Sequence, residues 1–195
     1  MEREIVMGGI GGQGVQLATK ILATALNNEN RYVMHFAAFG GTMRGGNVEC
    51  TVVTGTEPLA APPIIPQAWM TISMHPNTMP IVAPKTRPGG LLVVNASLVK
   101  DHGGLKDAAI VEIPASTMAE ELNNIQGAAM ILLGAICRAT GLVSVDQLIE
   151  GLKALTPPYR QKSVLANAKA FETGDAYARK RLEGFAHQAW ARAVA

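Results

Sequence analysis

The sequence predicts an α/β fold: an open, mostly parallel sheet flanked by helices, with a helical C-terminal third. Six short apolar runs lie before about residue 115, and some of them, such as residues 91–94, are apolar throughout, as strands covered on both faces are. A glycine-rich turn connects the first run to a helical pattern over residues 15–27. Beyond Ala115 the apolar residues recur at helical spacing. No internal repeat or linker divides the chain, so residues 1–195 are expected to form a single domain.

The individual elements follow from the same patterns. Strands are expected at residues 4–7, 32–36, 48–53, 69–73, 91–94 and 109–112, with loops at residues 62–66 and 84–90. Residues 127–139 are apolar nearly all round, which predicts a buried central helix. An amphipathic helix over residues 145–155 should begin at Ser144 or Asp146, and Ser116 or Thr117 should cap an earlier helical turn. Two apolar stretches, 164–171 and 182–189, predict helix in the tail.

Composition restricts the classes of function. Charged residues make up only 16% of the chain and hydrophobic residues 48%, which favours a large interface with partner proteins. The net charge of +2 is too small to indicate nucleic acid or a membrane surface as a partner. The longest apolar stretch is much shorter than the ~20 residues that span a bilayer. The two cysteines form no CxxC motif, and no signal peptide is present, so the sequence predicts a cytoplasmic protein without its own metal site.

The first glycine cluster, residues 8–14, contains the pattern G-x-G-x-x-G between a strand and a helix. The backbone N–H groups of Gly11, Gly12, Gln13 and Gly14 are therefore candidates to face the phosphates of a ligand. A dinucleotide site formed by this chain alone should also have an acidic residue at the end of the second strand, and that strand ends without one. Close packing of the helix on the sheet is the alternative role of these glycines.

A second cluster, residues 39–47, places Arg44 between two Gly-Gly pairs. An arginine there can clamp a phosphate or carboxylate, or it can bond loop carbonyls at a subunit interface, and the sequence leaves both open. Lys20 is expected to be solvated, and His75, just after a strand, to be structural. Cys50 and Cys137 lie in apolar runs, where a thiol is unreactive. No set of residues forms a recognisable catalytic group, so no catalytic residue is assigned.

The two glycine clusters, followed by Asn123-Asn124 and by the stretch from Leu132 to Gly141, resemble one family in order and spacing. The chain resembles the gamma subunit of the 2-oxoacid:ferredoxin oxidoreductases, which include the pyruvate, 2-oxoglutarate, 2-oxoisovalerate, indolepyruvate and phenylglyoxylate enzymes. The resemblance runs from Arg3 to about Gly174. It departs at the second cluster, where the family commonly has Y-G-x-E-x-R-G-G. Here Phe39 and Thr42 stand at the positions of the tyrosine and the glutamate.

The resemblance implies oxidative decarboxylation of a 2-oxo acid to its acyl-coenzyme A, with electrons passed to ferredoxin or NAD. It implies partner subunits of the alpha, beta and ferredoxin-like (delta) types, and in some members a flavin subunit. Thiamine diphosphate, magnesium and iron–sulfur clusters would lie on those partners. Coenzyme A would be held partly by this chain, with Gly11, Gly12, Gln13 and Gly14 at its phosphates and Arg44 in support. A stand-alone NAD-binding oxidoreductase and a scaffold subunit without a ligand are the competing hypotheses.

Overall fold

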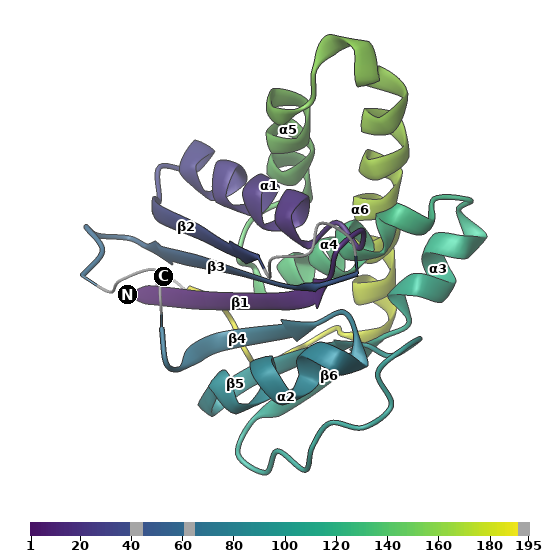
Figure 1. The fold of residues 1–195 in the computed structure, drawn as a ribbon. Coiled ribbons are helices and arrows are strands. Elements are labelled where there is room, and N and C mark those ends of the chain that lie inside the picture. Colours follow the sequence, from purple (N-terminus) through teal and green to yellow (C-terminus); the bar gives the residue numbers. More distant parts are fainter. Residues whose placement is uncertain (40–44, 61–64, 191–195) are drawn as a thin grey trace.

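A computed structural model describes residues 1–39, 45–60 and 65–190 of the chain as one six-stranded sheet with helices on both faces (Figure 1). The strands are β1 (Glu2–Ile10), β2 (Tyr32–Phe39), β3 (Asn47–Gly55), β4 (Ala68–Ser73), β5 (Thr86–Asn95) and β6 (Ala109–Ile113). Their order across the sheet is β2-β3-β1-β4-β5-β6. Strands β1, β4, β5 and β6 are parallel, whereas β3 is antiparallel to both β1 and β2. The predicted α/β class with a mostly parallel sheet is confirmed.

Helices cover the two faces of the sheet unequally. The larger layer contains α1 (Val15–Asn28), α4 (Ala128–Thr140), α5 (Val145–Leu155) and α6 (Gln161–Arg181). The opposite face carries the short α2 (Met79–Val82) between the 3-10 turns η1 (Pro76–Thr78) and η2 (Ala83–Lys85). Helix α3 (Ala115–Glu121) follows β6, and the single turns η3 (Ile125–Gly127) and η4 (Pro158–Arg160) precede α4 and α6. The main core therefore lies between the sheet and the larger layer.

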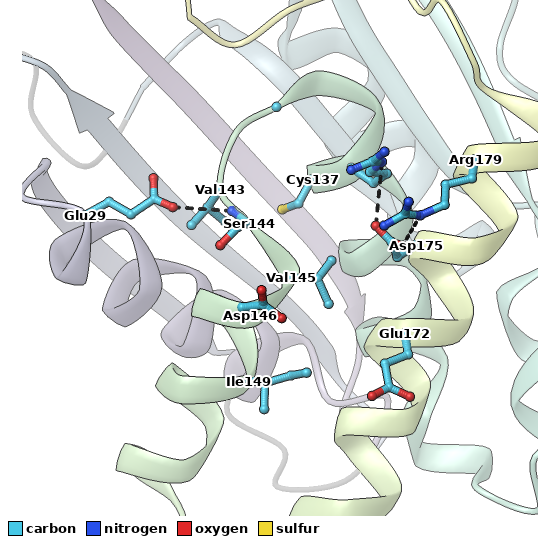
Figure 2. Close-up of a pocket in the computed structure, with 12 residues that line it drawn as sticks. Glu29, Cys137, Val143, Ser144, Val145, Asp146, Ile149, Glu172, Asp175 and Arg179 are labelled. Atoms are coloured by element: carbon cyan, nitrogen blue, oxygen red, sulfur yellow. Dashed lines mark hydrogen bonds and ion pairs between the residues drawn. The ribbon is translucent and has the colours of Figure 1, made fainter.

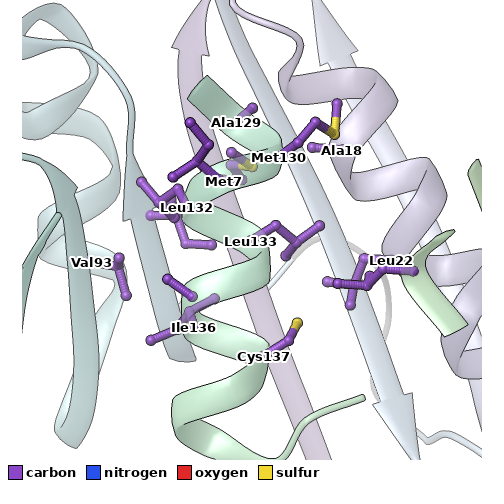
Figure 3. Packing of buried hydrophobic residues seen from close by; sticks show 14 of the residues in the cluster. Met7, Ala18, Leu22, Val93, Ala129, Met130, Leu132, Leu133, Ile136 and Cys137 are labelled. Carbon is purple, nitrogen blue, oxygen red and sulfur yellow. The ribbon is translucent and has the colours of Figure 1, made fainter. Parts of the chain in front are cut away.

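Helix α4 is the centre of that core, as Figure 3 shows. Its side chains between Ala128 and Cys137 are all buried, and among them Met130 and Leu133 lie with Met7 of β1 and Ala18 and Leu22 of α1 in one cluster. Helix α6 packs against its outer side so closely that a Cβ on Gly134 would overlap the carbonyl group of Phe171. The predicted buried helix is confirmed, and its glycine is explained by a neighbouring backbone.

The structure differs from the sequence prediction at several places, among them the helical segments between β4 and β5, which were not predicted. Residues 86–90 belong to β5, because strand pairing with β4 continues past an irregularity near Ala68. The tail helix ends at Arg181, and the 182–189 stretch packs without helical structure, with Ala189 N–H bonded to the carbonyl of Thr140. Ser116 does not cap α3; the Asn95 side chain at the end of β5 accepts the Ser116 N–H instead (3.2 Å).

Other local predictions hold. Helix α5 begins at Val145 with the Ser144 hydroxyl accepting the N–H of Gln147 (3.2 Å), as expected of an N-cap serine. Cys50 and Cys137 are buried, and Lys20 is exposed. In the described part of the chain, no helix combines the length and the apolar character that crossing a membrane would need.

Candidate functional site

The glycine turn, residues 11–14, connects β1 to α1 at the carboxyl end of the sheet. Gln13 donates its N–H to the carbonyl of Ile10 (3.1 Å), and the Gly14 carbonyl accepts from Ala18 N–H in the first turn of α1 (2.9 Å). Gly12 has φ +103° and Gly14 has φ +79°. Residues with a Cβ rarely adopt such angles, so the glycines at these two positions set the shape of the turn.

The glycines of this turn have different surroundings. A Cβ on Gly14 would lie 3.5 Å from the carbonyl oxygen of Gln126, just before α4, which is an ordinary contact distance. Gly9 is tighter still, since its Cβ would lie 2.7 Å from Val15 and 3.1 Å from Met74. By contrast, no atom of the described chain lies within 4 Å of a Cβ on Gly12. Packing therefore explains Gly9 and the positive φ explains Gly14, whereas Gly12 has no neighbour within 4 Å among the described residues.

The second glycine cluster lies beside the first. Antiparallel pairing of β1 with β3 sets Ile10 opposite Asn47, and Gly11 donates its N–H to the Gly46 carbonyl (2.9 Å). The loop between β2 and β3 therefore lies at the same end of the sheet as the glycine turn. Arg44 and its neighbours, residues 40–44, lie outside the described residues. What the structure brings together is the glycine turn and the end of the second cluster at Gly46.

The polar groups of Gln13 form hydrogen bonds with other residues of the chain. Its side-chain Oε1 accepts the N–H of Ile10 (2.9 Å), and its Nε2 donates to the Met74 carbonyl after β4 (3.3 Å). The backbone N–H of Gln13 is bonded to Ile10 as well. Among the four predicted phosphate-facing residues, Gln13 therefore fastens the ends of β1 and β4 together and shapes the turn.

Free donors are found at the start of α1. The N–H groups of Val15, Gln16 and Leu17 belong to the first turn, which has no intrahelical acceptors for them. Among the described residues no side chain caps this end, and its first turn contains no acidic residue. Gly12 and Gln16 are exposed beside it. Partial positive charge at a helix N-terminus favours an anion, so these groups can bind phosphate oxygens.

The turn also lies at the point where the strand order reverses. The chain leaves β1 toward β2 on one side, and later crosses to β4 on the other side. Ligands of open α/β sheets commonly bind at the carboxyl ends of strands at such a point. Two residues that sequence reasoning did not assign to this site, His75 after β4 and Asn95 at the end of β5, lie at the same edge.

Both of these residues have structural partners. His75 caps η1, since its Nδ1 accepts the N–H of Asn77 (3.2 Å). Asn95 is fully buried and donates from Nδ2 to the Ser116 hydroxyl (2.8 Å) and the Met74 carbonyl (3.4 Å). The polar residues that follow the apolar runs at β4 and β5 were the available signal in the sequence.

The strand order bears on the dinucleotide hypothesis. In a dinucleotide-binding unit the strand after the first helix lies next to the first strand, and its terminal acid reaches the ribose. Here β3 lies between β1 and β2, which moves the end of β2 two strand spacings, roughly 9 to 10 Å, from the turn. The G-x-G-x-x-G pattern is therefore present without the surroundings that give it that function.

A separate pocket opens between the C-terminal ends of α1 and α4, the start of α5, and α6 (Figure 2). Its volume is about 480 Å³, and its lining includes Glu29, Cys137, Ser144, Asp175 and Arg179. Asp175 pairs with Arg179 Nε (2.6 Å) and with Arg138 Nε (3.7 Å), so its charge is already balanced. Burial raises the pKa of the Cys137 thiol far above its usual value, and burial also raises the pKa of Cys50. The pocket therefore contains no activated nucleophile.

Within residues 1–39, 45–60 and 65–190, no three His, Cys, Asp or Glu side chains are grouped to hold a metal ion. The arrangement that remains is an anion-binding turn next to a second glycine loop. Its backbone N–H groups can position a phosphate-bearing ligand.

Comparisons with known proteins identify the family of the chain. A family model described as pyruvate ferredoxin/flavodoxin oxidoreductase matches residues 4–177. The 2-oxoglutarate synthase subunit KorC of Methanothermobacter marburgensis is 29% identical over 181 residues, which cover 89% of this chain and 95% of that protein. The pyruvate/ketoisovalerate oxidoreductases common subunit gamma of Thermococcus litoralis is 28% identical over 176 residues, covering 87% of this chain and 95% of that protein.

A solved structure has the same fold. The 2-oxoglutarate:ferredoxin oxidoreductase from Magnetococcus marinus, determined with 2-oxoglutarate, coenzyme A and succinyl-CoA bound, superimposes with a TM-score of 0.81 at 21% identity. The match covers 92% of this chain and 31% of that one. The unit formed by this chain therefore also occurs as part of a longer polypeptide.

Proposed function

This chain belongs to the pyruvate ferredoxin/flavodoxin oxidoreductase family, and from that membership we propose that it is the gamma subunit of a complex that oxidatively decarboxylates a 2-oxo acid to its acyl-coenzyme A. Relatives of its own length are named as the KorC and gamma subunits of such enzymes. The subunit supplies interface and part of the coenzyme A site, and it contributes no catalytic residue. Thiamine diphosphate, magnesium and the iron–sulfur clusters reside on alpha, beta and delta subunits, and ferredoxin or NAD accepts the electrons.

The observation that carries the coenzyme A assignment is the open space at Gly12 beside the uncapped start of α1. Coenzyme A supplies the thiol that receives the acyl group, and its phosphates need donors. The free N–H groups of Val15, Gln16 and Leu17 point out of the helix end, and a left-handed glycine lets a ligand approach the backbone. Gly11 and Gln13 hold the turn in shape through Gly46 and Ile10, and Arg44 is proposed as a further contact.

Two experiments test this function. Purification through a tag on this chain, followed by mass spectrometry, should recover thiamine-binding and iron–sulfur subunits. A chain that is recovered alone from its own cells, and is stable, would contradict the subunit assignment. Steady-state kinetics of the complex should then give a KM for coenzyme A that rises roughly 10- to 100-fold in Gly12→Val, which corresponds to one or two lost charge-assisted hydrogen bonds. The KM for the 2-oxo acid should stay unchanged.

Gly184→Val is the matched control. Gly184 also has a positive φ (+73°), and no described atom lies within 4 Å of its Cβ position, but it lies after α6. The control carries the same backbone strain without touching the turn, so it should leave both KM values unchanged. If Gly12→Val prevents assembly and the control does not, the scaffold hypothesis is favoured over a coenzyme A site. Saturable NAD binding by the isolated chain would favour a dinucleotide-binding protein instead.

A further inference from the structure

The two edges of the sheet are built differently. β6 forms one edge with only five residues; its Glu112 side chain is 57% exposed, and its Glu112 carbonyl accepts from the Tyr177 hydroxyl (3.3 Å). Short length and exposed charge are ordinary ways to prevent another strand from pairing with an edge. Within the described residues β2 forms the opposite edge, and its only strand partner is β3 (Figure 1).

β2 lacks these protective features. Its eight residues, YVMHFAAF, include no Asp, Glu, Lys, Arg or Pro. Although most of these residues are apolar, none of those whose side chains are described is buried, in contrast to the mostly buried β3 beside it. Tyr32 is 49% exposed and Phe36 is 40% exposed, and both point to the α2 side of the sheet, where Ile81 is also 41% exposed. Within the part of the chain that the structure describes, no strand pairs with the outer backbone groups of β2, which lie next to an apolar surface.

We propose that β2 is a self-pairing edge, through which a second copy of this chain adds its own β2 in antiparallel orientation and extends the sheet across a two-fold axis. Side chains alternate between the two faces of a strand. The α2 sides of the two copies therefore lie on the same face of the extended sheet only if even-numbered residues lie opposite even-numbered residues. A pairing centred on Phe36 meets this requirement. It sets Phe36 opposite its own copy and Met34 opposite Ala38, and aromatic and apolar cross-strand pairs of this kind stabilise a sheet.

The absence of charge from β2 is what favours a second copy as the occupant. In a two-fold pairing centred on Phe36, only Phe36 lies opposite its own counterpart and His35 and Ala37 lie diagonal to theirs, so a charge at any of these three positions would lie near a like charge. β2 carries none. His35, the only basic side chain on the strand, bonds Thr19 on α1 (3.1 Å), and burial together with the nearby Lys20 lowers its pKa, so it is neutral at pH 7. A partner of different sequence would place no such restriction on this strand.

Cysteine cross-linking of the full chain tests the pairing. Opposite Cβ atoms on antiparallel strands lie about 4.5–5.5 Å apart, close enough for a disulfide after small shifts. Phe36→Cys should therefore form a covalent dimer on mild oxidation. Tyr32→Cys is the matched control, because its two copies would lie roughly 27 Å apart along the paired strands. The native thiols, Cys50 and Cys137, are both buried, and oxidation of the wild-type chain measures any cross-linking that comes from them.

Analytical ultracentrifugation provides the second test. The wild-type chain should sediment in a monomer–dimer equilibrium, and Phe36→Lys should raise its dimer dissociation constant by roughly tenfold or more, since two lysines would then meet at the axis. Leu165→Lys, at a site 74% exposed on α6, should leave the dimer unchanged. Circular dichroism would verify that both variants are folded.

A wild-type chain that is monomeric at all concentrations, or equal cross-linking of the two cysteine variants, would overturn the proposal. If the chain is monomeric and Phe36→Lys instead prevents association with other subunits, the edge belongs to a partner strand and self-pairing is wrong. These readouts do not depend on the proposed enzymatic function. Failure to recover partner subunits would therefore leave the result on β2 intact.

Discussion

The backbone N–H of Gly11 donates to the carbonyl oxygen of Gly46 over 2.9 Å and joins the two glycine clusters of the chain. The contact exists because β3, which begins at Asn47, runs antiparallel beside β1. It brings the two glycine clusters, which are separate in the sequence, together at one end of the sheet. Stability measurements on the residues that build this end and the core behind it can check the structure independently of any activity.

Gln13→Ala should lower the free energy of unfolding by about 1–3 kcal/mol, because it removes the side-chain acceptor of the Ile10 N–H and one of the two side-chain donors to the Met74 carbonyl, the other being Asn95. Urea denaturation measures the change. Gln16→Ala, three residues along at an exposed position, removes the same side chain and should stay within about 0.5 kcal/mol of wild type. Equal effects of the two substitutions would show that the Gln13 side chain does not connect the strands.

Asn95→Ala should destabilise the chain by about 2–3 kcal/mol, since it leaves the partly buried Ser116 N–H and hydroxyl without their partner at the start of α3. Ser97→Ala is its control. The Ser97 hydroxyl accepts the next N–H, that of Thr117 (3.0 Å), but it is exposed, so water can replace it at a cost below about 1 kcal/mol. A larger loss in Ser97→Ala, measured by thermal or urea unfolding, would contradict the assignment of Asn95 as the cap.

Gly174→Ala should cost about 3 kcal/mol or more, because the added Cβ would overlap the Ile131 carbonyl where α6 crosses α4. Alanine is otherwise the better helix former, so a loss of stability would report the close backbone contact alone. Thr173→Ala, at a partly exposed position where the hydroxyl donates to the Lys169 carbonyl of the same helix (2.8 Å), should be near neutral. If Gly174→Ala is as stable as wild type, the two helices must lie farther apart than described.

The wild-type chain should lose stability as the pH falls from 7.5 to 5, in part because of His35. Burial, and then the positive charge of Lys20, lower the pKa of His35 in the folded state below its ordinary value near 6.5. The unfolded chain therefore binds the proton more readily, and stability falls as the pH drops below about 6.5. Denaturant titrations of His35→Gln should show a weaker pH dependence across this window. An unchanged dependence would mean that His35 titrates equally in both states.

Local patterns in the sequence were sufficient for most of the elements. Each predicted strand is present, and α5 spans the predicted residues 145–155, because apolar periodicity and a capping serine act over a few residues. The boundaries of β5 were not predictable in this way. Its first residues, 86–90, contain proline and two glycines, and only pairing with β4 makes them a strand.

The position of the glycine turn was predicted, but its internal contacts were predicted only in part, and its role as a ligand site stays a prediction. The glycine pattern located the turn and the family, because backbone geometry at Gly12 and Gly14 depends on the residue type itself. That Gln13 bonds inward to Met74 could not be read from the chain, since its partner follows a different strand.

The sequence by itself therefore determined the elements, the buried character of α4, the glycine turn and the family resemblance. Only the tertiary structure decided that β3 lies between β1 and β2, that Asn95 caps α3, and that β2 is left at an open edge. The physical reason is the distance along the chain over which each effect acts. Propensity and periodicity act between near neighbours in the chain, whereas strand order, caps and edges depend on contacts between residues that only folding brings together.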